Sequence, residues 1–222
     1  KPLYYGELGC EFFATSELSA LEQVAAGLEV DRDALQAYMR YACVPAPQTI
    51  YRGVKKLRPG TIQRFSLGED GVVCEAETAY WSIDNLGGAE LGRGLSQVHA
   101  DARVERALFE AVSEQMLSDV PLGAFLSGGV DSSLITALMQ SISDTPIDTF
   151  TIGFNEPGYN EAEHAKAVAR HLGTNHTELY LGQADALAVV PELATIYSEP
   201  FADSSQLPTA LLAKMTRGHV SV

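Results

Sequence analysis

The sequence predicts an α/β protein in which a parallel sheet with helices on both faces follows a smaller α+β part. After residue 99, short apolar segments alternate with segments of helical spacing, as in a parallel sheet with crossover helices. Before residue 82, several short strand-like segments surround one helical segment. A Gly-rich stretch without periodicity, residues 84–94, separates the two patterns. We therefore expect two domains, residues 1–82 and 99–222, joined by a linker over residues 83–98.

The first part is expected to hold one helix over residues 31–41. Asp31 is a suitable N-cap, and Leu35, Tyr38 and Met39 share one face of that helix. The Pro45-Ala46-Pro47 sequence ends the helical region, because proline cannot continue it. Short alternating segments predict strands at residues 3–5, 11–14, 61–66 and 72–79.

The second part reads as alternating helices and strands. A helix is expected over residues 99–117, and another over residues 160–173 with Asn160 as its cap and Gly173 as its stop. Apolar segments predict strands at residues 122–126, 150–154 and 176–181. Helical spacing also returns directly after the first of these strands, at Leu134, Ile135, Leu138 and Met139.

The most informative stretch is the Gly turn between that first strand and the helix that follows it. Ser127-Gly128-Gly129 lets backbone N–H groups approach an anion, and the helix dipole adds roughly half a positive charge. The spacing fits neither the Walker pattern nor the dinucleotide-binding pattern. A Ser-Gly-Gly turn is also a common structural connector, in which Asp131 would serve only as a helix cap.

The stretch Ser127-Gly-Gly-Val-Asp-Ser132 resembles the pyrophosphate-binding loop of the ATP pyrophosphatase superfamily, whose members cleave ATP between the α and β phosphates. Residues 150–154, 160–173, 176–181 and 198–208 follow in the order found in the synthetase domain of glutamine-dependent asparagine synthetases. Residues 1–5 and 16–21 resemble the closing strands of that family's N-terminal-nucleophile (Ntn) glutaminase domain. Residues 44–60 and Tyr80-Trp81 resemble the segment that crosses between the two domains.

The chain departs from the family pattern at both of its ends. The family's glutaminase uses an N-terminal Cys, whose own α-amino group is the base, and Cys10 cannot take that role from the tenth position. Family members also continue beyond Val222 into a Gly- and acid-rich loop that completes the ATP and magnesium site. We therefore expect a fragment cut at both ends, without glutaminase activity and without full synthetase activity.

The resemblance implies a nucleotide site at the loop and the ends of two strands. Asp131 is the magnesium candidate, with the helix cap as the alternative role. Phe125 stands where an aliphatic residue is common, and a larger side chain there narrows the pocket without removing main-chain contacts. The implied nucleotide-binding residues are Phe125, Leu126, Ser127, Gly128, Gly129, Val130, Asp131, Ser132, Ser133, Ile152 and Gly153.

Several other polar residues admit two interpretations. Glu199 and the run Asp203-Ser204-Ser205 could lie near the substrate at the carboxyl end of the sheet. The run could instead cap a helix beginning near Pro208, which we favour because proline suits the first helical position. His164 and His171 lie two turns apart and are expected at the surface or in packing, and the basic cluster Lys55, Lys56 and Arg58 is expected to be a solvated turn.

Composition excludes some classes of partner. The net charge is −14, with 15 Lys and Arg against 29 Asp and Glu, which argues against nucleic acid. No apolar run reaches the ~18 residues that span a bilayer, and nothing resembles a signal peptide, so we expect a cytoplasmic protein. The three cysteines form no metal pattern and are expected to be reduced and partly buried. An apolar sheet edge left at Val222 favours a homodimer or aggregation.

The resemblance implies an ATP- and Mg²⁺-dependent amidotransferase. ATP and aspartate would form β-aspartyl-AMP and pyrophosphate, and ammonia from glutamine would then displace AMP to give asparagine. One alternative is adenylation of another carboxylate, such as a β-lactam precursor or an acid of a cell-surface sugar. Another is a catalytically incompetent module that binds nucleotide or a partner.

Overall fold

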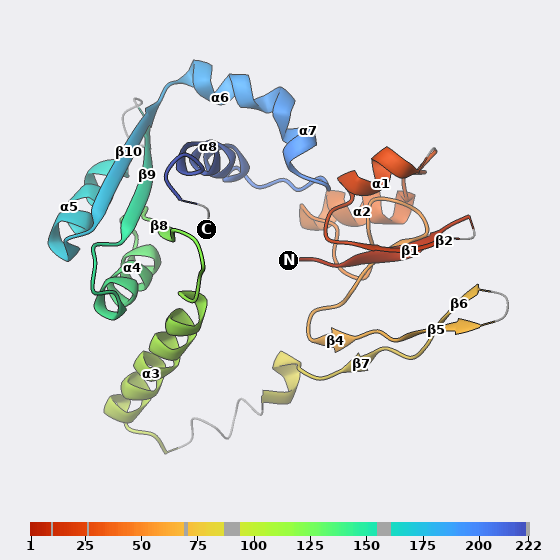
Figure 1. Ribbon diagram of the computed structural model, residues 1–222, viewed down its shortest axis with the longest axis horizontal. Helices are drawn as coiled ribbons and strands as arrows, with labels where there is room; N and C mark the ends of the chain where they lie inside the picture. Colours follow the sequence, from red (N-terminus) through yellow and green to blue (C-terminus); the bar gives the residue numbers. More distant parts are fainter. Residues whose placement is uncertain (10, 26, 69–70, 87–93, 155–160, 221–222) are drawn as a thin grey trace. The chain divides into compact units, whose positions relative to one another are not determined.

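The computed structural model describes the whole chain except residues 10, 26, 69–70, 87–93, 155–160 and 221–222. The chain forms two compact units (Figure 1). Unit 1 comprises Lys1–Leu91 and a later segment, Ala194–Ser204, whereas unit 2 comprises Gly92–Leu193 and Ser205–Val222.

Unit 1 is built on a three-stranded antiparallel sheet. Strand β1 (Tyr4–Leu8) lies between β2 (Glu11–Thr15) and β3 (Val54–Lys56), and Tyr4 pairs with Thr15 on one side and Lys56 on the other. Helix α1 (Ser19–Val24) contributes Leu21 to the core of this unit. That core consists of Tyr4, Leu18, Leu21, Ile50 and Val54.

The expected helix over residues 31–41 is confirmed as α2 (Arg32–Tyr41), with Asp31 as its N-cap. The Asp31 carboxylate accepts hydrogen bonds from the N–H groups of Asp33 (2.8 Å) and Ala34 (3.2 Å). Its predicted apolar face is wrong in part, because Leu35 and Met39 are exposed and Ala34 is buried.

The two long strands predicted after residue 60 are each divided in two. Strand β4 (Thr61–Ile62) pairs with β7 (Thr78–Ala79), and β5 (Phe65–Gly68) pairs with β6 (Gly71–Cys74). Two residues separate β4 from β5, whereas three separate β6 from β7, so the ladder carries an extra residue on one side. Such an extra residue is left unpaired and interrupts the ladder, as in a β-bulge.

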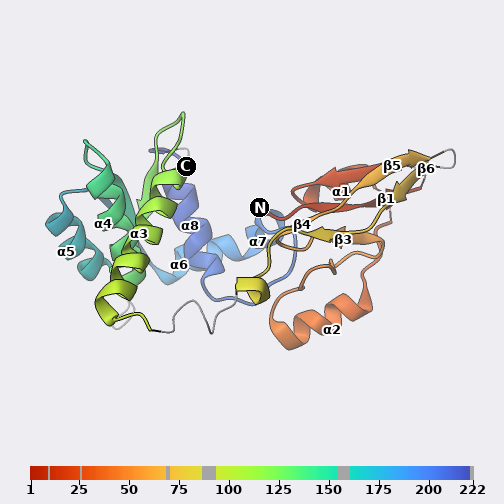
Figure 2. The ribbon, with the colours of Figure 1, turned by 90° about the horizontal axis from the view of Figure 1, so that it is seen from below.

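The predicted parallel sheet is confirmed in unit 2. Strands β8 (Gly123–Phe125), β9 (Asp148–Phe154) and β10 (Asn175–Leu181) are parallel, with β9 in the middle. Figure 2 shows this unit, with its helices, from a second direction.

Helices cover both faces of this sheet. Leu126, directly after β8, packs on Ala165 and Ala169 of α5 (Ala162–Leu172). The preceding residue, Phe125, lines a cavity together with residues of α8 (Gln206–Thr216). Because successive side chains of a strand point to opposite faces, α5 and α8 lie on opposite sides of the sheet.

Helix α4 (Val130–Ile142) packs beside α5, and α3 (Gln97–Gln115) packs on α4. Val112 of α3, Met139 of α4 and Ile147 form a second core cluster. Helix α5 ends at Gly173, whose φ of 76° is the left-handed C-cap that the sequence predicts, whereas its predicted cap Asn160 lies outside the described residues. The remaining elements are α6 (Gln183–Val189), a 3₁₀ turn (Val190–Glu192) and α7 (Leu193–Ile196).

The region expected to be a linker, residues 83–98, is partly regular. Ile83–Leu86 forms a 3₁₀ turn, and α3 begins at Gln97. Residues 87–93 lie outside the described residues. Cys43 and Cys74 are free and exposed, so the expected partial burial is wrong for both, and Cys10 is not among the described residues. Within the described chain, every helix is too short or too polar to cross a membrane.

Candidate functional site

The candidate site is the loop between β8 and α4, at the carboxyl end of the parallel sheet. The Leu126 N–H donates to the Phe150 carbonyl (2.9 Å), which continues the ladder one residue beyond β8. The chain then turns through Ser127–Gly129, and α4 begins at Val130 with Gly129 at the N-cap position. The first turn of a helix has N–H groups without intrahelical partners and a partial positive charge. This strand–turn–helix order, predicted from sequence, is therefore a suitable place for an anion.

Gly128 is required by both its backbone conformation and its surroundings. Its φ of 79° lies in the left-handed region that favours glycine. A Cβ atom at this position would stand 2.6 Å from the amide nitrogen of Ala165 and 2.8 Å from the carbonyl carbon of His164. The backbone of the first turn of α5 thus lies against Gly128 and leaves no room for a side chain there.

Two serines hold the loop in one shape. The Ser127 N–H donates to Ser132 Oγ (3.2 Å), and the two hydroxyl oxygens are 2.9 Å apart. The Gly129 N–H donates to Ser127 Oγ (3.3 Å). Within the described part of the chain, the buried Ser133 Oγ has no hydrogen-bond partner. Since buried hydroxyls are normally paired, this oxygen is a donor left unused at the start of α4.

The four residues expected to frame a nucleotide base lie on neighbouring strands. Phe125 pairs with Phe150, so Ile152 and Gly153 occupy the carboxyl-terminal end of β9, next to the strand that leads into the loop. Leu126 is 1% exposed, whereas Phe125 is 48% exposed and lines a cavity of about 730 Å³ with Phe150 and residues of α8. The fold brings these four residues together beside the candidate loop.

Asp131 is the second residue of α4, and its side chain is exposed. The alternative role as an N-cap is wrong, since Gly129 occupies that position. In the described ranges, no group of three or more His, Cys, Asp and Glu side chains could hold a metal ion by itself. Magnesium is usually held by one or two carboxylates together with substrate phosphates, and a single exposed carboxylate beside the candidate anion loop fits that pattern.

A polar cluster on β10 and α5 was not expected from the sequence. The Lys166 ammonium lies 3.0 Å from the Glu178 carboxylate, which also accepts a hydrogen bond from the Tyr180 hydroxyl (2.8 Å). Burial acts to raise the pKa of Glu178, but the hydrogen bonds from Tyr180 and Lys166 outweigh it and lower that pKa. The hydrogen bond to Glu178 raises the pKa of Tyr180 to about 12. The alternation of Glu178 and Tyr180 along one strand is the signal that could have revealed the cluster, which fastens α5 to the sheet.

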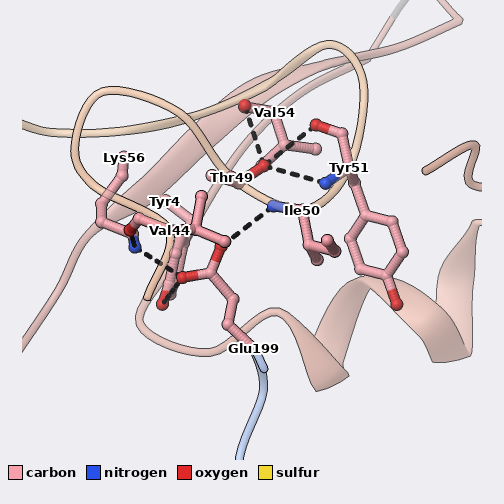
Figure 3. Close-up of polar contacts among 8 residues, drawn as sticks. All are labelled: Tyr4, Val44, Thr49, Ile50, Tyr51, Val54, Lys56 and Glu199. Atoms are coloured by element: carbon pink, nitrogen blue, oxygen red, sulfur yellow. Dashed lines mark hydrogen bonds and ion pairs between the residues drawn. The ribbon is translucent and has the colours of Figure 1, made fainter. Parts of the chain in front are cut away.

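Glu199 lies in unit 1, where its carboxylate is paired (Figure 3). Its partners are the Lys56 ammonium (2.5 Å), the Ile50 N–H (3.0 Å) and, more weakly, the Tyr4 hydroxyl (3.5 Å). The expectation that Lys56 belongs to a solvated turn is wrong, because its side chain is only 17% exposed. Alternation along β3 places Lys56 on the same side as buried Val54, and this was the missed signal.

The remaining polar candidates lie in different parts of the fold. Asp203 and Ser204 belong to the later segment of unit 1, Ala194–Ser204, whereas Ser205 occupies the N-cap position of α8. That helix begins at Gln206, two residues before the expected Pro208. His164 and His171 are exposed, as expected for surface residues.

These observations define the chain as an α/β protein whose parallel sheet carries a Gly-containing strand–turn–helix loop, the candidate anion site, preceded by a β-rich unit. Residues 103–222 match the family described as asparagine synthase, and residues 1–81 match the glutamine amidotransferase domain. The chain belongs to the asparagine synthase family.

Individual relatives agree with the family. The chain is 31% identical over 222 residues to "Asparagine synthetase [glutamine-hydrolyzing] 1" of Bacillus subtilis, an alignment covering 100% of this chain and 34% of the relative. It is 32% identical over 226 residues to "Putative asparagine synthetase [glutamine-hydrolyzing] 2" of Methanocaldococcus jannaschii, covering 100% of this chain and 42% of the relative. The chain therefore spans less than half the length of these curated relatives.

Proposed function

We propose that the protein to which this chain belongs is an ATP-dependent amidotransferase that makes asparagine from aspartate, with glutamine as the nitrogen source. The proposal rests on the family and on one observation of the structure. The Ser127–Gly129 turn and the first turn of α4, up to Ser133, lie at the carboxyl end of a parallel sheet, with Gly128 packed against α5. In open α/β sheets, ligands bind in this position.

In this proposal, the loop holds the pyrophosphate part of ATP. Backbone N–H groups at the start of α4 and the hydroxyls of Ser127, Ser132 and Ser133 donate to the phosphate oxygens. Main-chain groups of Phe125, Leu126, Ile152 and Gly153 frame the adenine. Asp131 supplies one carboxylate to a magnesium ion, which when bound offsets the negative charge of the phosphates. The larger Phe125 side chain leaves these main-chain groups in place.

The chemistry that such a site supports is adenylation. A carboxylate oxygen of aspartate attacks the α-phosphorus, the bond from that phosphorus to the β-phosphate oxygen breaks, and pyrophosphate leaves. Ammonia then attacks the acyl carbon of β-aspartyl-AMP, AMP leaves and asparagine forms. The contribution of the loop is to orient ATP and to stabilise the negative charge that develops on the leaving pyrophosphate.

In the same proposal, residues 1–82 are part of the amidotransferase domain, with an Ntn-type fold, and residues 99–222 are part of an ATP-pyrophosphatase-type synthetase domain. Residues 83–98 connect them. The match of residues 1–81 to the glutamine amidotransferase domain supports this division.

Exchange of labelled pyrophosphate into ATP by the whole protein tests the reaction. We expect exchange that requires aspartate and magnesium, together with release of AMP and pyrophosphate when ammonium is present. Exchange that requires a different carboxylic acid would support the adenylation site but contradict aspartate as its substrate. Release of ADP and phosphate would contradict the proposal, since the bond between the β and γ phosphates would then be cleaved.

A further inference from the structure

The segment Ala194–Ser204 belongs to one family match by sequence and to the other by packing. It lies within the region matched by the asparagine synthase family, residues 103–222, yet it packs as part of unit 1. Most of unit 1 is the region matched by the glutamine amidotransferase domain. At both of its ends the segment continues into unit 2. A short piece of the synthetase-matched chain is therefore held by the amidotransferase-matched unit.

The anchor of the segment is the Glu199 carboxylate (Figure 3). One oxygen, Oε2, pairs with the Lys56 ammonium at 2.5 Å, and the other, Oε1, accepts the Ile50 N–H at 3.0 Å. The side chains of Glu199 and Lys56 are only 12% and 17% exposed. Both oxygens of this largely buried carboxylate thus have a donor from unit 1.

Lys56 is itself held in place by other groups of unit 1. Its ammonium donates to the Val44 carbonyl (2.9 Å) and lies 5.7 Å from the centre of the Tyr4 ring. A second tie lies three residues beyond Glu199, where the Ala202 N–H donates to the Ala42 carbonyl (2.7 Å). Ala42 is the left-handed C-cap of α2, so its carbonyl is presented by the end of that helix. The segment is therefore fixed at two points.

The physical character of the pair points to a positioning role. Taking two charges out of water is costly, and a buried pair contributes little stability beyond what apolar groups of the same shape would give. Removing one partner is costly, however, because it leaves the other charge buried and alone. Beside the pair is a cavity of about 380 Å³, lined in part by Cys43, Lys56 and Tyr197, so apolar packing does not enclose the segment on that side. Specific polar contacts, more than close packing, determine where the segment lies.

We propose that the Lys56–Glu199 pair is a clip that holds the synthetase-matched segment in position on the amidotransferase unit, and that transfer of nitrogen from glutamine to the synthetase requires this clip. This inference rests on the proposed function. Lys56 is a positioning residue, since it acts through Glu199 and the segment that carries it. The clip matters when nitrogen must pass from one unit to the other, and much less when free ammonium supplies it.

Asparagine formation by the whole protein with either glutamine or ammonium tests the clip. We expect Lys56→Met to lower the glutamine-dependent rate about tenfold relative to the ammonium-dependent rate, because it leaves a buried carboxylate unpaired. Lys56→Arg keeps the charge and should retain most of the ratio. Arg52→Met is the matched control, because it removes an exposed ion pair with Glu29 from the same region (3.2 Å, side chains 61% and 72% exposed).

The outcomes separate the inference from the proposed function. A wild-type protein that makes no asparagine from either nitrogen source would overturn the proposed function. A Lys56→Met protein with an unchanged glutamine-to-ammonium ratio would overturn the clip and leave the proposed function standing. A loss that Arg52→Met shares would also overturn the clip, since the effect would then belong to surface charge in general.

Hydrogen exchange of the present chain gives a readout independent of activity. In Lys56→Met, the amides of Ile50 and Ala202 should exchange about tenfold faster, because the two ties of the segment are loosened together. The Leu126 amide, in unit 2, should keep its protection, which shows that the effect is confined to unit 1. Unchanged exchange at Ile50 and Ala202 would overturn the clip. If unit 1 fails to fold in this variant, Lys56→Arg decides, and it should exchange like the wild type.

Discussion

The backbone of Ala165 lies directly against Gly128, so that a Cβ atom on Gly128 would stand only 2.6 Å from the Ala165 amide nitrogen. Ala165 is completely buried and belongs to a helix that follows the loop only after another strand. The shape of the candidate anion loop therefore depends on how α5 is docked, as well as on the loop's own sequence.

Substitution of Gly128 tests that dependence. Gly128→Ala should lower the free energy of unfolding by about 3 kcal/mol or more, because left-handed strain adds to a clash with backbone atoms. Gly173→Ala is the matched control, since Gly173 has nearly the same φ (76° against 79°), but an added Cβ there would meet no atom within 4 Å in the described residues, apart from Gly173 and its two chain neighbours. It should cost only about 1–2 kcal/mol. Chemical denaturation of the three proteins measures the difference, and equal losses would show that packing against α5 is unimportant.

Leu126 and Phe125 are neighbours in sequence but should respond very differently to truncation. Leu126 is 1% exposed and packs on Ala165 and Ala169, so Leu126→Ala should cost about 2–5 kcal/mol. Phe125 is 48% exposed, so Phe125→Ala should cost no more than about 1 kcal/mol. Thermal unfolding monitored by circular dichroism compares the two. A larger loss at Phe125 would contradict the burial of Leu126 and the exposure of Phe125.

Stability should fall in mildly acidic solution because of His176. Its Nδ1 lies 2.9 Å from the Thr149 hydroxyl, and its Nε2 is buried without a partner in the described part of the chain. Burial lowers the pKa of His176 below its ordinary value of 6.5; Glu178 opposes this shift and Lys166 adds to it. The unfolded chain therefore takes up a proton first as the pH falls, and stability is lost from pH 6.5 downwards until the folded pKa is reached.

The urea midpoint of wild type and His176→Asn, measured at about pH 8 and about pH 5, checks this effect. The wild type should lose more stability between the two conditions than the variant does. Equal losses would show that His176 is protonated as easily in the folded protein as in the unfolded chain.

Tyr4 should lose its proton only at an unusually high pH, because it is buried and lies beside Glu199. Burial, followed by the charge of Glu199 and the hydrogen bond to it, raises the pKa of Tyr4 to about 12. The folded state keeps this proton longer than the unfolded chain, so its contribution to stability is lost as the pH rises from 10 towards 12. Glu199→Gln should lower the pKa of Tyr4 but leave it above 10, since burial remains.

The ultraviolet absorbance of tyrosinate follows this titration, and a Tyr4→Phe variant identifies the transition. Tyr51, whose hydroxyl donates to Glu22, also has a pKa raised to about 12 and should be unaffected by Glu199→Gln. A Tyr4 transition that is the same with and without the Glu199 charge would contradict the contact between them.

Local patterns were enough to predict the strand–turn–helix around Ser127, because apolar strand residues, a Gly pair and helical spacing follow one another within a few positions. The support of Gly128 by α5 was not predictable, since it depends on how segments from different parts of the sequence pack. The same limit explains why the burial of Lys56 was not predicted. Its neighbours in sequence indicate a solvated turn, and its partner Glu199 comes from a distant part of the sequence. In α2, spacing identified an apolar side but could not show that small Ala34, and not Leu35 or Met39, would be buried.

Binding of Mg-ATP by the whole protein, measured by calorimetric titration, is the most direct test of the nucleotide site at the start of α4. Asp131→Asn removes the exposed carboxylate at the start of α4, and Asp144→Asn removes another exposed carboxylate from the loop after the same helix. We expect saturable binding that Asp131→Asn weakens about tenfold or more while Asp144→Asn leaves it unchanged. A wild-type protein that does not bind Mg-ATP, or an Asp131→Asn protein that binds it as tightly as the wild type, would contradict the proposed nucleotide and magnesium site.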